Sequence, residues 1–196
     1  MNVSRKKMAE HREQILAAAA KRFREHGFDG ISVADLMKEA GLTHGGFYGH
    51  FSSKEELVAL ASLRAMGETV AKWEKVVDEA PGNPLEALAK SYLSLRHHDH
   101  PETGCLLAAL GSELARQPSS VRDAVREGQQ QFFALLTRIV PGQTKAARKK
   151  KAIAVLATMI GGMVLARTVS DPQLRQEILE TVAASIPRSV QDHTRV

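Results

Sequence analysis

The chain is poor in the residues that build crosslinked, cysteine-ligated or membrane-spanning proteins. Its 196 residues include one cysteine, which excludes an intrachain disulfide and a cysteine-based zinc framework. The longest apolar stretch, Ala152 to Ala166, is interrupted by Thr158 and by two glycines, and is too short to span a bilayer. Ile15 to Ala20 is a weak apolar segment for a signal peptide, and two basic residues follow it directly. We therefore expect a cytoplasmic protein that does not contact a membrane.

The sequence also lacks the motifs that usually mark an enzyme. It contains no glycine-rich phosphate loop, no nucleophile elbow and no paired catalytic motif. We therefore predict no enzymatic activity and no cofactor. The run from His97 to His100 includes three histidines, but adjacent histidines in a loop point in different directions and no spaced ligands accompany them. We predict a solvated loop there, without a metal, and a solvated helix face for the basic run Lys145 to Lys151.

The overall composition is that of an ordinary globular protein. Hydrophobic residues make up 43% of the chain and charged residues 25%, so neither disorder nor a fibre is indicated. The net charge is +5 and the isoelectric point is near 9.5. An anionic partner is consistent with this balance, although charge alone does not establish one.

The apolar spacing predicts an all-α protein of about nine helices, because helical periodicity recurs and no alternating strand pattern is present. Gly27 and Gly41 mark the ends of the first two helices. Ser32 with Asp35, and Ser53 with Glu56, are typical of capping boxes. The predicted helices are 8–26, 32–41, a short one capped by Thr43, 53–79, 85–97, 102–116, 119–139, 144–168 and 172–186. A three-helix domain would occupy residues 1–52, joined by the long helix to a helical domain over residues 53–196.

Residues Gly41 to Leu57, GLTHGGFYGHFSSKEEL, are the most informative segment. A turn glycine precedes a very short helix with an aromatic pair, and a strong helix start follows, as in a helix-turn-helix reading head. The spaced elements are Gly41, Phe47-Tyr48, His50-Phe51 and Ser53 to Leu57. With them, residues 9–60 resemble the DNA-binding domain of the TetR family of bacterial transcriptional regulators.

Each residue type in this segment suits a particular contact with double-stranded DNA. Phosphates are the expected partners of six side chains, which are Arg12, Ser32, Thr43, Tyr48, His50 and Lys54. Base edges are the expected partners of His44, Gly45 and Gly46 in the first turn of the short helix. Three glycines in this helix cost up to about 1 kcal/mol each in helix propensity, and they leave His44 as the main reading side chain. DNA shape and thymine methyl groups are therefore expected to supply part of the specificity.

The resemblance also implies a homodimeric repressor on a near-palindromic operator, released when a small-molecule effector enters the helical domain. The candidate pocket residues are Met66, Trp73, Tyr92, Leu106, Phe132, Phe133 and Met163, with ordinary core as the competing interpretation. The expected dimer surface uses the last two helices. Its small residues would be Ala154, Ala157, Gly161 and Gly162, and its apolar stripe would be Leu174, Ile178, Val182 and Ile186.

Cys105 raises an alternative mechanism. The segment Thr103 to Leu106, followed by Ser112 to Leu114, is similar to the region around the sensing cysteine in the repressor of N-ethylmaleimide reductase, which responds to electrophiles. A thiol near a helix start is activated, whereas a lone cytosolic cysteine is more often an apolar filler. A redox- or electrophile-sensing repressor is therefore one alternative. An architectural DNA-binding protein without an effector is another, from a different functional class.

Overall fold

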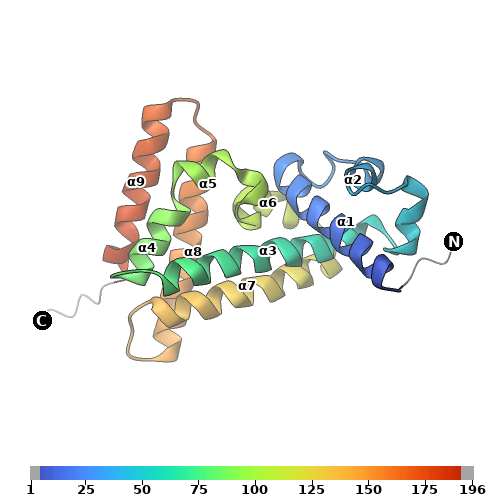
Figure 1. Cartoon of the computed structure of the whole chain (residues 1–196). Coiled ribbons are helices and arrows are strands. Elements are labelled where there is room, and N and C mark those ends of the chain that lie inside the picture. The colour runs from blue at the N-terminus through green and yellow to red at the C-terminus, as the bar shows by residue number, and fades with distance from the viewer. Residues whose placement is uncertain (1–4, 191–196) are drawn as a thin grey trace, which may run out of the picture. The chain divides into compact units, whose positions relative to one another are not determined.

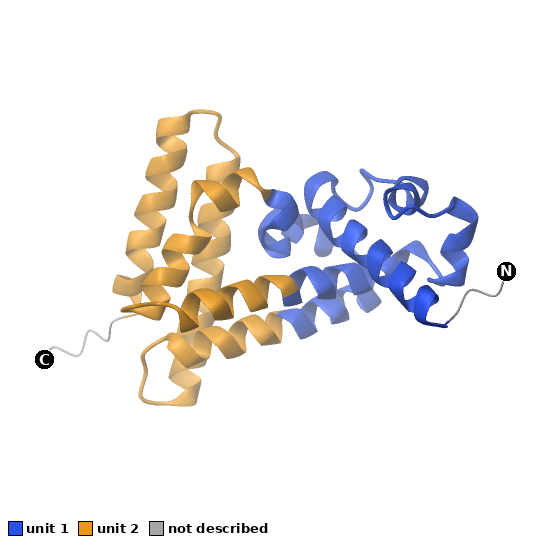
Figure 2. Ribbon diagram, in the orientation of Figure 1, with its two compact units in different colours: residues 1–67, 101–128 blue, residues 68–100, 129–196 orange. Residues whose placement is uncertain are grey.

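In the computed structural model, residues 5–190 are described, and they form nine α-helices, two short 3₁₀-helices and no strand (Figure 1). The all-α prediction is therefore confirmed. The chain divides into two compact units (Figure 2). Unit 1 comprises residues 1–67 and 101–128, and unit 2 comprises residues 68–100 and 129–196. The boundary falls inside two long helices, α3 (Lys54–Asp78) and α7 (Ser119–Ile139).

Unit 1 contains the segment that resembles a reading head. It includes α1 (Arg5–His26), α2 (Val33–Glu39), η1 (His44–Gly49), η2 (Pro101–Thr103) and α6 (Leu106–Leu114), besides the first parts of α3 and α7. Its core is apolar and aromatic, with Ile15, Phe23, Phe28, Leu36, Met37, Phe47 and Phe51 all almost fully buried. Phe28 lies edge-on to Phe23, with ring centroids 5.4 Å apart. The buried face of η1 is thus fixed against α1 and α2.

The predicted helix ends of unit 1 are largely confirmed. Gly27 and Gly41 have φ angles of 81° and 71°, the left-handed conformation that terminates helices. Ser32 Oγ accepts the Asp35 N–H at 3.1 Å, and Ser53 Oγ accepts the Glu56 N–H at 3.1 Å. The Glu56 carboxylate, however, accepts the N–H of Ser52 at 2.7 Å.

Unit 2 contains α4 (Pro84–Tyr92), α5 (Leu95–Asp99), α8 (Lys145–Arg167) and α9 (Pro172–Ser189), besides the later parts of α3 and α7. The helix predicted over 85–97 is interrupted, because Ser94 Oγ accepts the His97 N–H at 3.3 Å and starts α5. The solvated loop predicted for the histidine run is therefore wrong. His97 and His98 lie on a short helix and are half-buried.

The α8 and α9 helices pack on each other inside unit 2. A Cβ at Gly162 would lie 2.8 Å from Val182 Cγ1 and 3.0 Å from Leu93 Cδ2, so only glycine permits this approach. Ile186 is 1% exposed. The expectation that Gly162 and Ile186 form a dimer surface is therefore wrong, because both are buried by packing within the subunit. Among the described residues, no helix combines the length and apolar character needed to cross a membrane.

Candidate nucleic-acid interface

The reading segment is a single 3₁₀-helix, η1, and not an α-helix. Gly46 N donates to Thr43 O at 3.0 Å, and His50 N donates to Phe47 O at 2.9 Å. Three glycines in six residues favour this short, tight form, because glycine stabilises longer α-helices poorly. The predicted cap is wrong in one respect. Thr43 occupies the N-cap position, but its side chain makes no capping hydrogen bond.

One side of η1 faces outward and carries the segment's exposed polar groups. Residues three apart eclipse in a 3₁₀-helix, so Gly45 and Tyr48 share a side. Tyr48 is 75% exposed, and a Cβ at Gly45 would have no atom within 4 Å. His44 is also exposed. The outward side of η1 thus presents a phenol beside bare backbone, and the exposed His44 precedes it at the start of the helix.

The buried side of η1 anchors that surface. Phe47 is 2% exposed and lies edge-on to the Tyr48 ring at 5.3 Å between centroids. Phe47 also stacks on Phe51 at 5.6 Å. A Cβ added at Gly46 would face this side, because it would lie 3.7 Å from Met37 Cε. The two glycines predicted to meet base edges are therefore placed differently, with Gly45 outward and Gly46 toward α2.

Two of the predicted phosphate ligands already hold partners inside unit 1. Lys54 Nζ donates to Ile31 O at 3.4 Å and lies 3.9 Å from the exposed carboxylate of Asp29. Ser32 Oγ donates to Asp35 Oδ2 at 2.5 Å, and this bond contributes most to holding the Asp35 pKa below its ordinary value. A phosphate would have to replace these internal partners. Both sites are exposed enough for such an exchange.

Arg12 is fixed at the junction of α1 and α3. Its Nη2 lies 3.2 Å from Glu56 Oε1, and its guanidinium carbon lies 4.7 Å from the Phe51 ring centre. Hydrogen bonds from the Ser52 backbone and hydroxyl lower the Glu56 pKa, and Arg12 lowers it further. Glu56 is therefore ionised at neutral pH and keeps Arg12 paired.

His50 is neighboured by a histidine that sequence reasoning did not identify. The His11 ring on α1 lies 6.0 Å from the His50 ring. Partial burial, followed by the charges of His11 and Arg12, lowers the His50 pKa. His50 is thus neutral at pH 7 and can donate a single N–H. Nothing in the sequence pattern identifies His11, because the contact depends on how α1 packs beside η1.

Comparison with known proteins agrees with this geometry. A model of bacterial regulatory proteins of the tetR family matches residues 15–61, and a model of tetracyclin repressor-like C-terminal domains matches residues 81–182. The chain belongs to the TetR family. It is therefore a helix-turn-helix transcriptional regulator by family, and the resemblance noted in the sequence is confirmed.

Relatives of this TetR-family chain match it over different lengths. The transcriptional regulator LmrA of Bacillus subtilis is 26% identical over 167 residues, which is 82% of the chain and 88% of LmrA. The repressor NemR of Escherichia coli is 26% identical over 137 residues, covering 67% of the chain and 69% of NemR. YerO of Bacillus subtilis matches 47% of the chain at 27% identity, and the match spans 32% of YerO. The crystal structure of reduced E. coli NemR has the same fold, with a TM-score of 0.76 at 21% identity over 95% of this chain and all of that one.

The predicted pocket residues of this TetR-family chain are divided between the units. Trp73, Tyr92, Phe132, Phe133 and Met163 belong to unit 2, whereas Met66, Cys105 and Leu106 belong to unit 1. Within unit 2, Trp73 stacks on Phe132 at 4.7 Å and lies edge-on to Tyr92 at 5.6 Å. Phe133 is half-buried and Met163 is buried. In unit 1, Met66 packs where α3 approaches Gly128 of α7.

Cys105 occupies the N-cap position of α6 and is 1% exposed. Residues just before α6 and near its end bind the last turn of α1 and the segment that follows α1. Arg24 Nη1 donates to Gly104 O at 3.1 Å, and Glu113 accepts the Phe28 N–H at 3.0 Å. The segment that holds the thiol is thus bonded to the helix that supports the reading head. Among the described residues, no group of three histidine, cysteine or acidic side chains is arranged to hold a metal.

Proposed function

We propose that this TetR-family chain is a cytoplasmic, homodimeric repressor that binds a near-palindromic operator through η1 and leaves it when a small molecule binds the helical domain, residues 53–196. The observation that carries the proposal is the outward side of η1. There, Tyr48 and His44 are exposed beside Gly45, which lets the backbone approach the floor of a groove. Lys54 at the start of α3 adds a cation where the helix dipole also favours a phosphate.

The DNA-binding step is tested with the DNA that flanks the protein's own gene. Labelled fragments are titrated with protein and followed by fluorescence anisotropy, with shuffled DNA of equal length as the control. A sequence-specific regulator prefers its site by a factor of about 10³ or more. An architectural DNA-binding protein would bind both fragments with similar affinity, and that result would overturn the proposal.

An exposed apolar strip supports a homodimer. Leu165 is 57% exposed, Ile153 45%, Leu174 43% and Val164 40%. Ile153, Val164 and Leu165 lie on α8 and Leu174 lies on α9. Ala154, Ala157 and Gly161 are also exposed on α8, and their small side chains would allow a second helix to approach closely. An apolar patch of this kind marks a protein interface more often than a free surface. A two-fold dimer would also supply the second reading head that a palindromic site requires.

The dimer is tested by placing a charge in this strip. Leu165→Asp is expected to convert the protein to a monomer in sedimentation velocity and to weaken operator binding strongly. Ser91→Asp, at an exposed position on α4, is the matched control and should leave both unchanged. A Leu165→Asp protein that remains dimeric with full operator affinity would exclude this surface.

A thiol-sensing repressor acting through Cys105 is the second candidate mechanism. The N-cap position of the thiol and the hydrogen bond from Arg24 of α1 to the neighbouring Gly104 favour it, whereas near-complete burial slows access of a reagent. Treatment with an electrophile should release DNA from the wild type and not from Cys105→Ser. Equal release from both proteins would exclude the thiol mechanism and leave non-covalent effector binding.

A further inference from the structure

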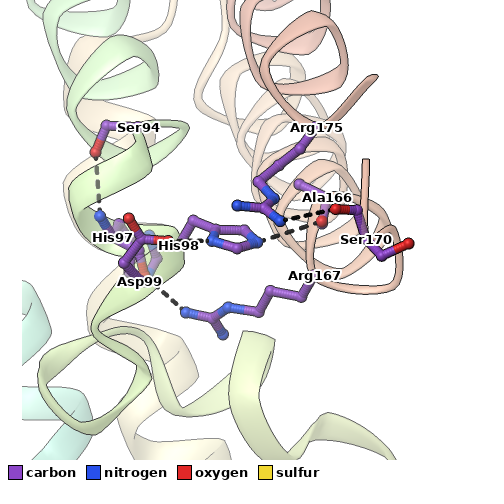
Figure 3. Close-up of polar contacts among 8 residues, drawn as sticks. All are labelled: Ser94, His97, His98, Asp99, Ala166, Arg167, Ser170 and Arg175. Carbon is purple, nitrogen blue, oxygen red and sulfur yellow. Dashed lines mark hydrogen bonds and ion pairs between the residues drawn. The ribbon is translucent and has the colours of Figure 1, made fainter. Parts of the chain in front are cut away.

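Unit 2 contains a group of basic side chains that the DNA-binding function does not use. His98 on α5, Arg167 at the end of α8 and Arg175 on α9 approach one another, and Figure 3 shows the His98 ring between the two arginine side chains. The sequence supplies few opposing charges here. No aspartate or glutamate occurs between Glu127 and Asp171, so α8 presents no carboxylate to the group.

The two carboxylates nearest in sequence already have partners. Asp99 Oδ1 lies 2.7 Å from His98 Nδ1. The other ring nitrogen of His98, Nε2, lies 3.3 Å from Ala166 O. Both ring nitrogens of His98 are therefore engaged within unit 2. Asp171 caps α9, since its Oδ1 accepts the N–H groups of Gln173 and Leu174. The hydrogen bond from His98, and with it the charge of Arg175, lowers the Asp99 pKa, so Asp99 is a nearby counter-charge for Arg175. No hydrogen bond joins Arg175 to either carboxylate among the described residues.

Arg175 is left with an incomplete set of hydrogen bonds. Its Nη2 donates to Ser170 O over a long 3.5 Å, and its Nε is buried without a hydrogen-bond acceptor. The side chain is only partly exposed. A guanidinium carries five N–H donors in a planar fork, and leaving one of these donors buried without an acceptor is unfavourable. The same fork matches the two oxygens of a carboxylate or a phosphate.

We propose that Arg175, together with Arg167, binds the anionic group of the effector, a carboxylate or a phosphate. This inference rests on the proposed effector-controlled repressor and specifies the chemical class of its ligand. Arg167 holds its position because its Nη2 donates to His97 O at 2.8 Å, which ties α8 to α5 (Figure 3). An anion held by Arg175 and Arg167 would link α9 to α8, and through Arg167 to α5, and would fix the turn between α8 and α9.

A reporter of this site is built into unit 2. Trp73 is the one tryptophan in the chain, and its ring contacts Tyr92. Tyr92 in turn contacts the His97 ring, with 4.5 Å between centroids, and its carbonyl lies 2.7 Å from His97 Nδ1. Movement of α5 on anion binding is therefore expected to change the Trp73 fluorescence.

The test titrates the full-length protein with inorganic phosphate and, separately, with acetate, each against chloride at matched ionic strength. We expect a saturable change in Trp73 fluorescence with at least one anion. Arg175→Gln should weaken that binding at least tenfold, and Arg175→Lys should weaken it less. Arg188→Gln on the same helix is the control and should bind like the wild type. A response to phosphate alone assigns a phosphate ligand, and a response to acetate assigns a carboxylate.

Two results would overturn the inference. One is a wild type that shows no saturable response to either anion, and the other is an equal response in Arg175→Gln, with folding verified by circular dichroism. Operator binding is measured on the same samples. If the protein binds its operator but not anions, only this inference is contradicted. If it binds anions but no operator, only the proposed function is contradicted.

Discussion

The helices η1 and α5 are both short and both carry histidines, but their polar side chains are in opposite situations. On η1, the side chains of Tyr48 and His44 are exposed and form no hydrogen bond with any described residue. On α5, the His97 ring binds a backbone carbonyl, and His98 lies between a carboxylate and a carbonyl. Polar groups without internal partners can bind an external one, whereas satisfied groups stabilise the fold. Substitutions on η1 should therefore change DNA affinity, and those at His97 should change stability.

The largest expected effect concerns the buried His97 on α5 and is seen in how the free energy of unfolding depends on pH. Burial lowers the His97 pKa from 6.5 to about 4. Between these values the unfolded chain binds a proton that the folded chain does not. The stabilisation is thus complete above pH 6.5 and is lost as the pH falls toward 4. The loss amounts to about 3 kcal/mol at most.

This loss is measured by urea unfolding at pH 7.5 and pH 4.5. His97→Asn retains a donor for the Tyr92 carbonyl but cannot titrate, so its stability should depend much less on pH in this range. His44→Asn on η1 is the control and should keep the pH dependence of the wild type. If His97→Asn loses as much stability in acid as the wild type does, His97 is not the titrating group.

Gly161 and Gly162 are neighbours on α8, but one is exposed and the other is buried against α9, so they allow the same comparison of exposed and packed positions. Gly162→Ala would place a methyl group 2.8 Å from Val182 Cγ1, and such overpacking costs about 1–3 kcal/mol. Gly161→Ala meets no atom within 4 Å and gains up to about 1 kcal/mol in helix propensity. Thermal unfolding of the two variants should therefore shift in opposite directions. Equal shifts would contradict the packing of α8 on α9 described above.

Tyr48 tests the outward side of η1. Tyr48→Phe removes one hydroxyl from an exposed ring and should weaken operator binding about five- to tenfold, as expected for one lost hydrogen bond of about 1 kcal/mol. The melting temperature should not change, because the ring retains its contact with Phe47. Anisotropy and calorimetry measure the two quantities. A destabilised variant with intact DNA binding would assign Tyr48 to the core.

Lys54 should act through charge. Lys54→Gln is expected to weaken binding to specific and shuffled DNA alike and to reduce the slope of log K against log salt by about 1. Titrations at several salt concentrations measure that slope. Lys90→Gln on α4, where the lysine pairs with Glu86 at 2.7 Å, is the control. An unchanged slope for Lys54→Gln would mean that the ammonium stays on Ile31 O when DNA binds.

The features that could be predicted from the sequence are those that depend on neighbouring residues. Gly27 and Gly41 end their helices, and Ser32 and Ser53 begin theirs, because each signal acts within about four residues along the chain. The core positions Phe47 and Phe51 follow from the same local pattern. The family resemblance of the reading segment rests on signals of this kind as well.

The remaining features depend on tertiary packing, which a single sequence does not encode locally. The burial of His97 requires α5 to lie near α8, and the pairing of His11 with His50 requires α1 to lie beside η1. Gly46 was expected to face DNA together with Gly45, but the tighter 3₁₀ turn directs it toward Met37. The DNA contacts themselves stay predictions.

Gly45 gives the smallest expected effect and the sharpest distinction within η1. A methyl group there meets nothing in unit 1, so Gly45→Ala should stabilise the fold by a few tenths of a kcal/mol through reduced backbone entropy in the unfolded chain. The same methyl group would stand between η1 and a DNA groove, so operator affinity should fall while stability rises. Gly46→Ala is the control, since its methyl group would contact Met37 and leave the DNA-facing side unchanged. If Gly45→Ala binds the operator as tightly as Gly46→Ala does, close backbone approach is not the reason for glycine at position 45.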